Sequence, residues 1–176
     1  MRWLLWVVGV LIVIPGVLAL AGSLLPKGHR ASRTATLRQP PGAVWEAITR
    51  FEEHPSWRTD IRRMERLPDQ DGRPLWREVR RSGPLTYVVA ESTPPSRLVT
   101  RIADPKLPFG GTWTYEITAA EAGCTITLTE DGEIHNPIFR LLARFVFGYH
   151  GTMETYLKAL GKKFGEDVTP APRGTS

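Results

Sequence analysis

Apolar and polar residues form three different patterns along the chain, and each pattern predicts a different kind of element. The first stretch, from Trp3 to Leu25, contains no charged residue. Because a helix of roughly 20 apolar residues spans the core of a bilayer, this stretch predicts a transmembrane anchor with a short linker, over residues 1–30. A cleaved signal peptide is the alternative, since Arg2 gives a charged start and "ALA" resembles a cleavage site ending at Ala21.

The second pattern is a two-residue alternation that predicts short β-strands. A first strand over 31–39 is followed by "PPGAVWEAITRFEEHPSW", whose apolar residues recur at helical spacing up to Pro55. Five or six strands then follow between residues 61 and 134, separated by turn residues such as Asp71-Gly72. Connections this short are typical of antiparallel neighbours in one meander.

The last two strands lie in "GGTWTYEITAAEAGCTITLTEDGEI", residues 110–134. Alternation puts the aromatic and aliphatic side chains of this ribbon on one face and most of its threonines on the other. A two-stranded ribbon is not stable with such a face in water. The face therefore needs a cover from another part of the chain.

The third pattern is a helical stripe in "NPIFRLLARFVFGYHGTMETYLKALGKKFGE", which predicts one long C-terminal helix capped by Asn136. We expect this helix to cover the aromatic ribbon. The fold class is then α+β, with a curved antiparallel sheet of 6–7 strands wrapped around the long helix in one domain, 31–165. The tail, 166–176, is predicted to be disordered.

The charges are unevenly distributed. The chain has 23 Lys and Arg against 18 Asp and Glu, and residues 1–40 contain five of the basic residues and no acidic one. The remaining chain is therefore neutral, which removes the main support for nucleic-acid binding. Three basic residues next to the apolar stretch are expected to contact the membrane surface: Lys27, Arg30 and Arg33. Their excess over Arg2 favours a cytoplasmic domain on a single-pass anchor, and the alternative is secretion after cleavage near Ala21.

Few residue types for cofactor or metal chemistry are present. The single cysteine, Cys124, lies on the apolar face of its strand and is interpreted as a small buried hydrophobe. It cannot form a disulfide within the chain, and a zinc site based on cysteine is disfavoured. No phosphate loop or nucleophile motif is found in the sequence. We expect no cofactor and no metal.

The order of strand, helix, strands and long helix, with "PPGAVWEAITRFEEHPSW", "WTYEI" and "CTITLTEDGEI" at its landmarks, resembles the START-like (Bet v 1-like, or SRPBCC) superfamily. The resemblance is to its polyketide cyclase/dehydrase and lipid-transport group, and it covers about residues 31–165. It implies the helix-grip fold, with a largely apolar cavity between the sheet and the last helix. Family members bind lipids, sterols, polyketides or other apolar molecules there, and some catalyse cyclisation.

Ten residues are expected to line such a cavity, because aromatic and aliphatic walls suit apolar ligands: Trp57, Trp76, Tyr87, Trp113, Tyr115, Ile126, Leu128, Phe145, Tyr149 and Met153. Complete filling of the core by the same side chains is the alternative. Arg101 and Glu78 lie within strands and could either meet a polar group of the ligand or form a surface ion pair.

Glu130 is the one catalytic candidate. It continues the inward phase of Cys124, Ile126 and Leu128, so its carboxyl could face the cavity, where burial would raise its pKa and suit acid–base chemistry. The alternative is a charge at the rim, beside Glu133.

Three functions follow from these expectations. The first is membrane-tethered binding or transport of an apolar small molecule or lipid, with residues 3–25 in the membrane. The second is a cyclase or dehydratase acting through Glu130, and the third is a filled domain that docks a protein partner. The sequence leaves open the identity of the ligand, whether a reaction is catalysed, and the oligomeric state.

Overall fold

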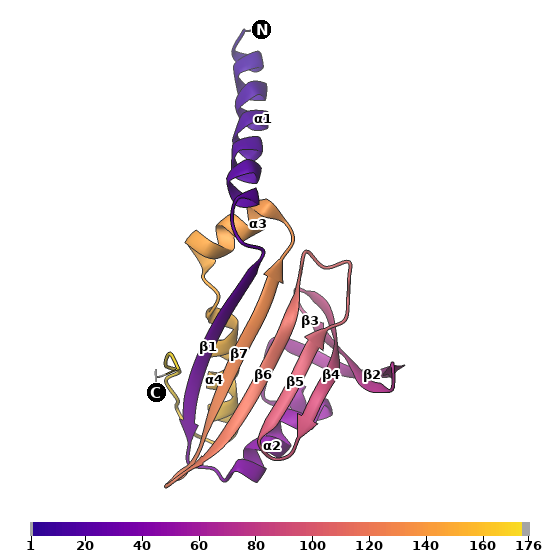
Figure 1. Ribbon diagram of the computed structural model, residues 1–176, viewed down its shortest axis with the longest axis vertical. Coiled ribbons are helices and arrows are strands. Elements are labelled where there is room, and N and C mark those ends of the chain that lie inside the picture. Colours follow the sequence, from indigo (N-terminus) through magenta and orange to yellow (C-terminus); the bar gives the residue numbers. More distant parts are fainter. Residues whose placement is uncertain (1, 174–176) are drawn as a thin grey trace.

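The computed structural model describes residues 2–173, and within the first helix it describes the side chains of Trp3 and of the residues from Val13 onward. A curved sheet forms one layer, and short and long helical segments cover its concave face (Figure 1). One apolar helix, α1 (Arg2–Ser23), projects from one end of this domain.

Seven antiparallel strands form the sheet, in the order β1-β7-β6-β5-β4-β3-β2, which confirms the predicted meander and strand number. Their bounds are Gly28–Leu37 (β1), Ile61–Gln70 (β2), Arg73–Arg80 (β3), Gly83–Thr93 (β4), Arg97–Ile102 (β5), Phe109–Ala120 (β6) and Gly123–Ile134 (β7). The two longest strands, β6 and β7, pair from Phe109 with Ile134 to Ala120 with Gly123. The aromatic ribbon predicted from the alternation is therefore one continuous hairpin, which lies between β1 and β5 in the sheet.

Turn residues join the strands where the sequence predicted breaks. Between β2 and β3, Asp71 and Gly72 both have positive φ, at 51° and 72°. Two consecutive residues of this kind match the twist of a tight hairpin, which is why Asp-Gly is favoured there. The short helix α2 (Pro41–Thr49) begins with proline in its first turn, as predicted, and is followed by a 3-10 segment, η1 (Phe51–Ser56). Together they close one end of the sheet.

The C-terminal helix is not continuous, contrary to the prediction. It consists of α3 (Pro137–Leu142), a π-helical turn η2 (Ala143–Phe147) and α4 (Gly151–Lys163). Asn136 caps α3 as expected, and its side chain accepts a hydrogen bond from the backbone N–H of Phe139 at 3.0 Å. The break lies at Gly148, whose φ of 69° is a conformation that other residues rarely adopt. Of these three segments, α4 lies along the concave face of the sheet (Figure 1).

The tail is ordered as far as Arg173, which also departs from the prediction. Thr34 and Ala171 exchange two backbone hydrogen bonds of 2.8 and 2.9 Å. Because β1 is an edge strand, its outer backbone groups need partners, and the tail supplies them here. Val168 is also buried against the core. The rest of the predicted tail, 174–176, lies outside the described residues.

The helix α1 is held to the domain at its C-terminal end. The buried Arg140 of α3 donates hydrogen bonds from Nη1 to the backbone oxygens of Gly22 and Leu25, at 3.0 and 2.9 Å. The carbonyls at a helix end lack partners within the helix, so the guanidinium provides them. Within the part of the chain that the structure describes, no helix combines the length and apolar character needed to cross a membrane.

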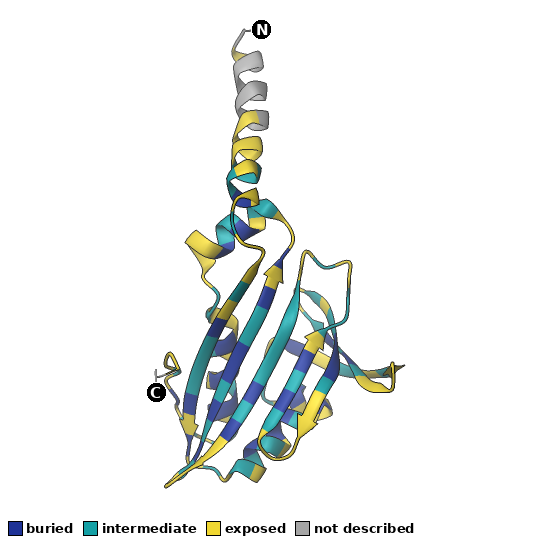
Figure 2. Cartoon of the chain, in the orientation of Figure 1, coloured by how far each residue is buried: buried dark blue, intermediate teal, exposed yellow. Residues whose placement is uncertain are grey.

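The core is concentrated where α2 and α4 pack on the sheet (Figure 2). Ile126, Leu128, Met153 and Leu160 are fully buried there, and Cys124 lies among them as the buried hydrophobe that the sequence predicted. The sheet and the helical segments are not in full contact everywhere, and the space left between them, which extends to α3 and η2, is the candidate site.

Candidate functional site

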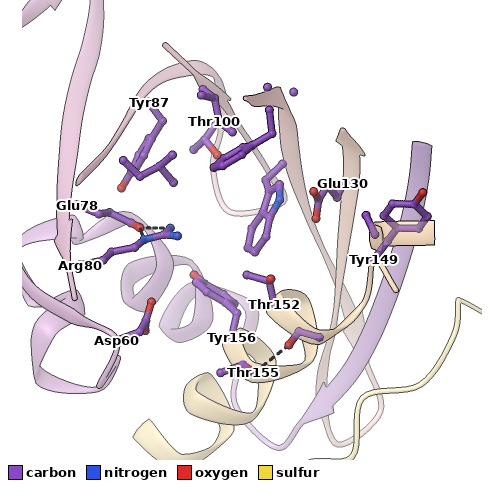
Figure 3. Close-up of a pocket in the computed structure, with 18 of the residues that line it drawn as sticks. Asp60, Glu78, Arg80, Tyr87, Thr100, Glu130, Tyr149, Thr152, Thr155 and Tyr156 are labelled. Atoms are coloured by element: carbon purple, nitrogen blue, oxygen red, sulfur yellow. Dashed lines mark hydrogen bonds and ion pairs between the residues drawn. The ribbon is translucent and has the colours of Figure 1, made fainter. Parts of the chain in front are cut away.

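A cavity of about 680 Å³ lies between the concave face of the sheet and α4. Its lining comes from β1, β3, β4, β5, β6 and β7 on one side and from the segments η1, α3, η2 and α4 on the other. Figure 3 shows Tyr156 projecting from α4 into this space, with Glu78 and Arg80 on one side and Glu130 and Tyr149 on the other. Side chains therefore do not fill the interior completely, which argues against the alternative of a filled core.

Two periodicities produce the lining. On β6, the two-residue repeat turns both Trp113 and Tyr115 to the concave face. On α4, Thr152, Tyr156 and Ala159 follow one another at intervals of four and three residues, which places them on one face of the helix. The cavity wall thus combines aromatic rings from both the sheet and the helix with the short side chains of Thr152 and Ala159.

Four of the ten residues expected to line the cavity do face it: Tyr87, Trp113, Tyr115 and Tyr149. Another four lie in the filled part of the core, where α2 and α4 contact the sheet: Trp76, Ile126, Leu128 and Met153. Their inward direction was evident from the alternation, but the position of the contact between helix and sheet was not.

The other two expected lining residues lie elsewhere. Trp57 is half-buried and packs behind Tyr156, with the ring centroids 5.5 Å apart, outside the cavity lining. Phe145 is 70% exposed on η2, because the break at Gly148 turns this segment away from the sheet. A continuous helix would have kept Phe145 on the same stripe as Tyr149.

Aromatic rings contact Tyr156 edge to face, at interplanar angles of 85° for Trp113 and 61° for Tyr115. Its ring centroid lies 6.0 Å from that of Trp113 and 5.6 Å from that of Tyr115. The guanidinium carbon of Arg58 lies 5.2 Å from the centre of the same ring. These edge-to-face and cation–π contacts hold the Tyr156 side chain in one orientation.

One side of the cavity carries a network of paired charges. Arg58 donates from Nη1 to Glu78 at 2.7 Å and from Nη2 to Asp60 at 2.8 Å, and Arg80 also donates to Glu78. The side chains of Arg58 and Glu78 are only 8% and 4% exposed. Burial opposes the charge of Arg58, but Glu78 and Asp60 raise its pKa. Burial alone would raise the pKa of Asp60, yet its hydrogen bond and charge interaction with Arg58 bring it below the usual value.

From the sequence, Glu78 was an ambiguous strand residue, and Arg58, Asp60 and Arg80 were not expected at the cavity. Glu78 meets Arg58 inside the domain rather than on a surface. Arg101 is exposed and does not line the cavity. Arg58 and Asp60 lie in the connection between η1 and β2, where no repeat predicts a direction, so no signal in the sequence marked them.

Four titratable side chains that carry no charge lie near the paired charges. His54 is 2% exposed, and burial, reinforced by the charge of Arg58, lowers its pKa to about 3. Burial raises the pKa of the phenols of Tyr87, Tyr115 and Tyr156. All four side chains are therefore uncharged near neutral pH.

Glu130 faces the cavity from the opposite side, as its phase on β7 predicted. Burial raises the pKa of its carboxyl, although His29 and Trp113 act in the other direction. His29 Nε2 lies 3.4 Å from Glu130 Oε1, and the imidazole stacks on Tyr149 with ring centroids 3.9 Å apart. This arrangement places one carboxyl and one imidazole at the edge of an apolar space, and a carboxyl with a raised pKa suits proton transfer there.

The basic residues expected at a membrane surface have different environments. Lys27 and Arg30 are exposed, and Arg30 lies 3.5 Å from Asp131. Arg33 instead pairs with Glu154 of α4 at 2.7 Å, and its side chain is only 15% exposed. Its role is therefore to join β1 to α4, which departs from the expectation.

The chain belongs to the family described as polyketide cyclase/dehydrase and lipid transport, which matches residues 28–165. This result and the helix-grip architecture confirm the resemblance to the START-like superfamily. No curated protein matches the sequence.

Solved structures with the same fold are distant in sequence. The Zhui aromatase/cyclase from a Streptomyces species has a TM-score of 0.59 at 14% identity, covering 76% of this chain and 91% of that one. A START superfamily protein from Mycobacterium smegmatis gives 0.58 at 19% identity, with 77% and 96% covered. Norcoclaurine synthase from Thalictrum flavum gives 0.59 at 7% identity, with 82% and 90% covered. At these identities the similarity establishes the fold and leaves function to the site.

Proposed function

We propose that this protein binds an apolar small molecule or lipid in the cavity between the sheet and α4. The observation that carries the proposal is a space of about 680 Å³ with aromatic walls inside an otherwise well-packed domain. This volume lies within the range typical of small-molecule sites. Each 100 Å² of apolar ligand surface buried there would contribute about 2.5 kcal/mol.

Mass spectrometry of small molecules that co-purify with the full chain tests this proposal. We expect an apolar compound to be recovered after gentle purification, or after incubation of the protein with a lipid extract. Recovery of no apolar compound in both experiments would contradict the proposal. A second preparation, stripped of ligand by organic extraction and refolded, provides the background.

An enzyme of the cyclase or dehydratase type is the second candidate, and Glu130 is the observation that favours it. A carboxyl with a raised pKa beside an imidazole can donate or accept a proton next to a bound polyketide-like substrate. Replacement Glu130→Gln would then abolish turnover of such a substrate while leaving its binding intact. Equal turnover by the variant and the wild type would exclude this role.

Attachment to a membrane through residues 3–25, with the domain on the cytoplasmic side, is a further part of the proposal. Two features support it: the stretch has no charged residue, and apolar side chains are exposed both on α1 and on the adjoining η2. On η2 these are Phe145, Val146 and Phe147, and Phe147 also lines the cavity. The proposed attachment would place the cavity opening close to the lipid.

Membrane fractionation of the expressed protein, combined with its intact mass, tests this attachment. We expect the uncleaved chain to sediment with membranes and to be released by detergent but not by alkaline carbonate. Release by carbonate, or a mass that begins after Ala21, would contradict the anchor. The second result would favour the signal-peptide alternative.

A further inference from the structure

We infer that the ligand is an uncharged apolar molecule with a hydroxyl or carbonyl oxygen, and that Tyr156 binds this oxygen. The inference rests on the proposed function, because it requires a ligand in the cavity. It adds the chemical class of the ligand and its orientation.

Among the described residues that line the cavity, Tyr156 Oη, His29 Nδ1 and His54 Nδ1 are buried polar atoms without a hydrogen-bond partner, and Tyr156 carries the one hydroxyl of this group. The residue is only 3% exposed, and within the described chain its hydroxyl has no hydrogen-bond partner. Tyr115 lies beside it, with the ring centroids 5.6 Å apart, but the distance and angle between the two hydroxyls do not meet those of a hydrogen bond. A buried hydroxyl without a hydrogen bond destabilises the folded protein, because it has lost its bonds to water. A ligand oxygen next to Tyr156 would remove this destabilisation.

The orientation of Tyr156 suits this role. Trp113, Tyr115 and Arg58 contact its ring, which limits the positions that the hydroxyl can occupy. Figure 3 shows the hydroxyl directed towards the side of the cavity that holds Glu78 and Arg80. The polar end of the ligand would therefore lie on this side, and its apolar body would extend towards Tyr149 and the α3–η2 segment.

Charge on the same side disfavours ionic ligands. Both arginines that line the described cavity, Arg58 and Arg80, are already paired with carboxylates. A ligand carboxylate would have to displace Glu78 or Asp60 or remain unpaired, and a buried unpaired charge is costly. A ligand cation beside Tyr156 would lie close to Arg58. An uncharged oxygen avoids both penalties.

Four pyrene probes that differ in one substituent test this inference: pyrenemethanol, methylpyrene, pyrenecarboxylate and pyrenemethylamine. Their affinities for the full chain at neutral pH are measured by pyrene fluorescence. We expect pyrenemethanol to bind about fivefold more tightly than methylpyrene, which corresponds to roughly one buried hydrogen bond. The two charged probes should bind at least tenfold more weakly than pyrenemethanol.

Two tyrosine variants locate the interaction. Tyr156→Phe keeps the aromatic ring, so it should abolish the preference for pyrenemethanol and change the affinity for methylpyrene by less than twofold. Tyr149→Phe is the matched control, because Tyr149 lines the opposite side of the cavity, and it should keep the preference.

The possible failures are distinguishable. Tighter binding of either charged probe than of pyrenemethanol would overturn the inference, and so would a preference that survives in Tyr156→Phe. Methylpyrene binding without any preference among the probes would overturn this inference and leave the proposed function standing. Failure of all four probes to bind would overturn both. The comparison among probes in the wild type does not depend on the folding of any variant.

Discussion

Two sides of one cavity use charged residues in different ways. On the side formed by η1, the connection that follows it and β3, one network of ion pairs joins Arg58, Asp60, Glu78 and Arg80. On the side formed by β1 and β7, the carboxyl of Glu130 has His29 as its neighbouring ionisable group. In the first arrangement the opposite charges lie within contact distance and stabilise one another. The second leaves a carboxyl whose charged form is disfavoured by burial.

Under the proposed enzyme function, this difference would separate the structural role of the paired charges from the chemical role of Glu130. A closed network of charges holds η1 and β3 together and sets the polarity that a ligand meets. A single carboxyl near an imidazole, by contrast, can change its protonation state without disrupting the fold. The following variants test whether the two sides differ in this way, beginning with the largest expected effect.

Breaking the paired side should have the largest effect on stability. Glu78→Gln removes a charge that is 4% exposed and leaves Arg58 without its closest buried partner. We expect a loss of about 3–5 kcal/mol in the free energy of unfolding, the range measured for buried pairs that lose one member. Urea denaturation of the variant and the wild type measures this loss.

A double replacement provides the control for this prediction. Arg58→Met combined with Glu78→Leu removes both charges, so it should be more stable than Glu78→Gln alone. A loss of less than 1 kcal/mol in Glu78→Gln would show that the network does not stabilise the domain.

Acid should destabilise the domain through His54. The pKa of this imidazole is lowered to about 3 in the folded protein, whereas an unfolded histidine titrates near its ordinary value of 6.5. The stability due to neutral His54 is therefore present above pH 6.5 and is lost progressively as the pH falls towards 3. The loss is about 1.4 kcal/mol per pH unit within this window.

The pH dependence can be assigned to His54 by replacing it. Between pH 6.5 and pH 4, His54→Gln should lose about 3 kcal/mol less stability than the wild type does. Denaturation curves at both pH values measure the difference. Parallel losses in the two proteins would mean that His54 titrates normally.

Glu130, on the opposite side of the cavity, should affect the stability less than His54 does, and its effect should change with pH in the opposite direction. Burial raises the pKa of Glu130, so the stability that its neutral form contributes is present at low pH and is lost as the pH rises through the folded pKa. Glu130→Gln should therefore be more stable than the wild type at pH 8, and this advantage should disappear near pH 4. Thermal melts at both pH values provide the measurement. A destabilised variant at pH 8 would show that the ionised carboxyl is stabilised where it lies.

The sequence predicted the fold through features that repeat. The alternation in β6 and β7 established which side chains face the interior, including Glu130, and turn residues such as Asp71-Gly72 marked the hairpins. Asn136 marked the start of the last helical region. Each of these signals is local, since it depends on a residue and its near neighbours in the chain.

The features that the sequence did not predict depend on distant contacts. Gly148 is compatible with a helix as well as with the positive φ that it adopts, so the residue type alone did not mark the break there. Arg33 resembles a surface residue until Glu154 of α4 comes within 2.7 Å. The boundary between the filled core and the cavity likewise depends on where α4 approaches the sheet. Residues such as Trp76 and Met153 therefore could not be separated from Trp113 and Tyr115 in advance.

The central claim is that the cavity holds an apolar ligand, and a pair of tryptophan variants tests it most directly. Ala159 lines the cavity from α4, so Ala159→Trp places a large side chain in the space. Lys158→Trp adds the same side chain at the neighbouring exposed position and serves as the matched control. The measurement is the affinity of pyrenemethanol for each folded variant. The account predicts at least a tenfold loss in Ala159→Trp and wild-type affinity in Lys158→Trp, whereas equal affinities in both would contradict it.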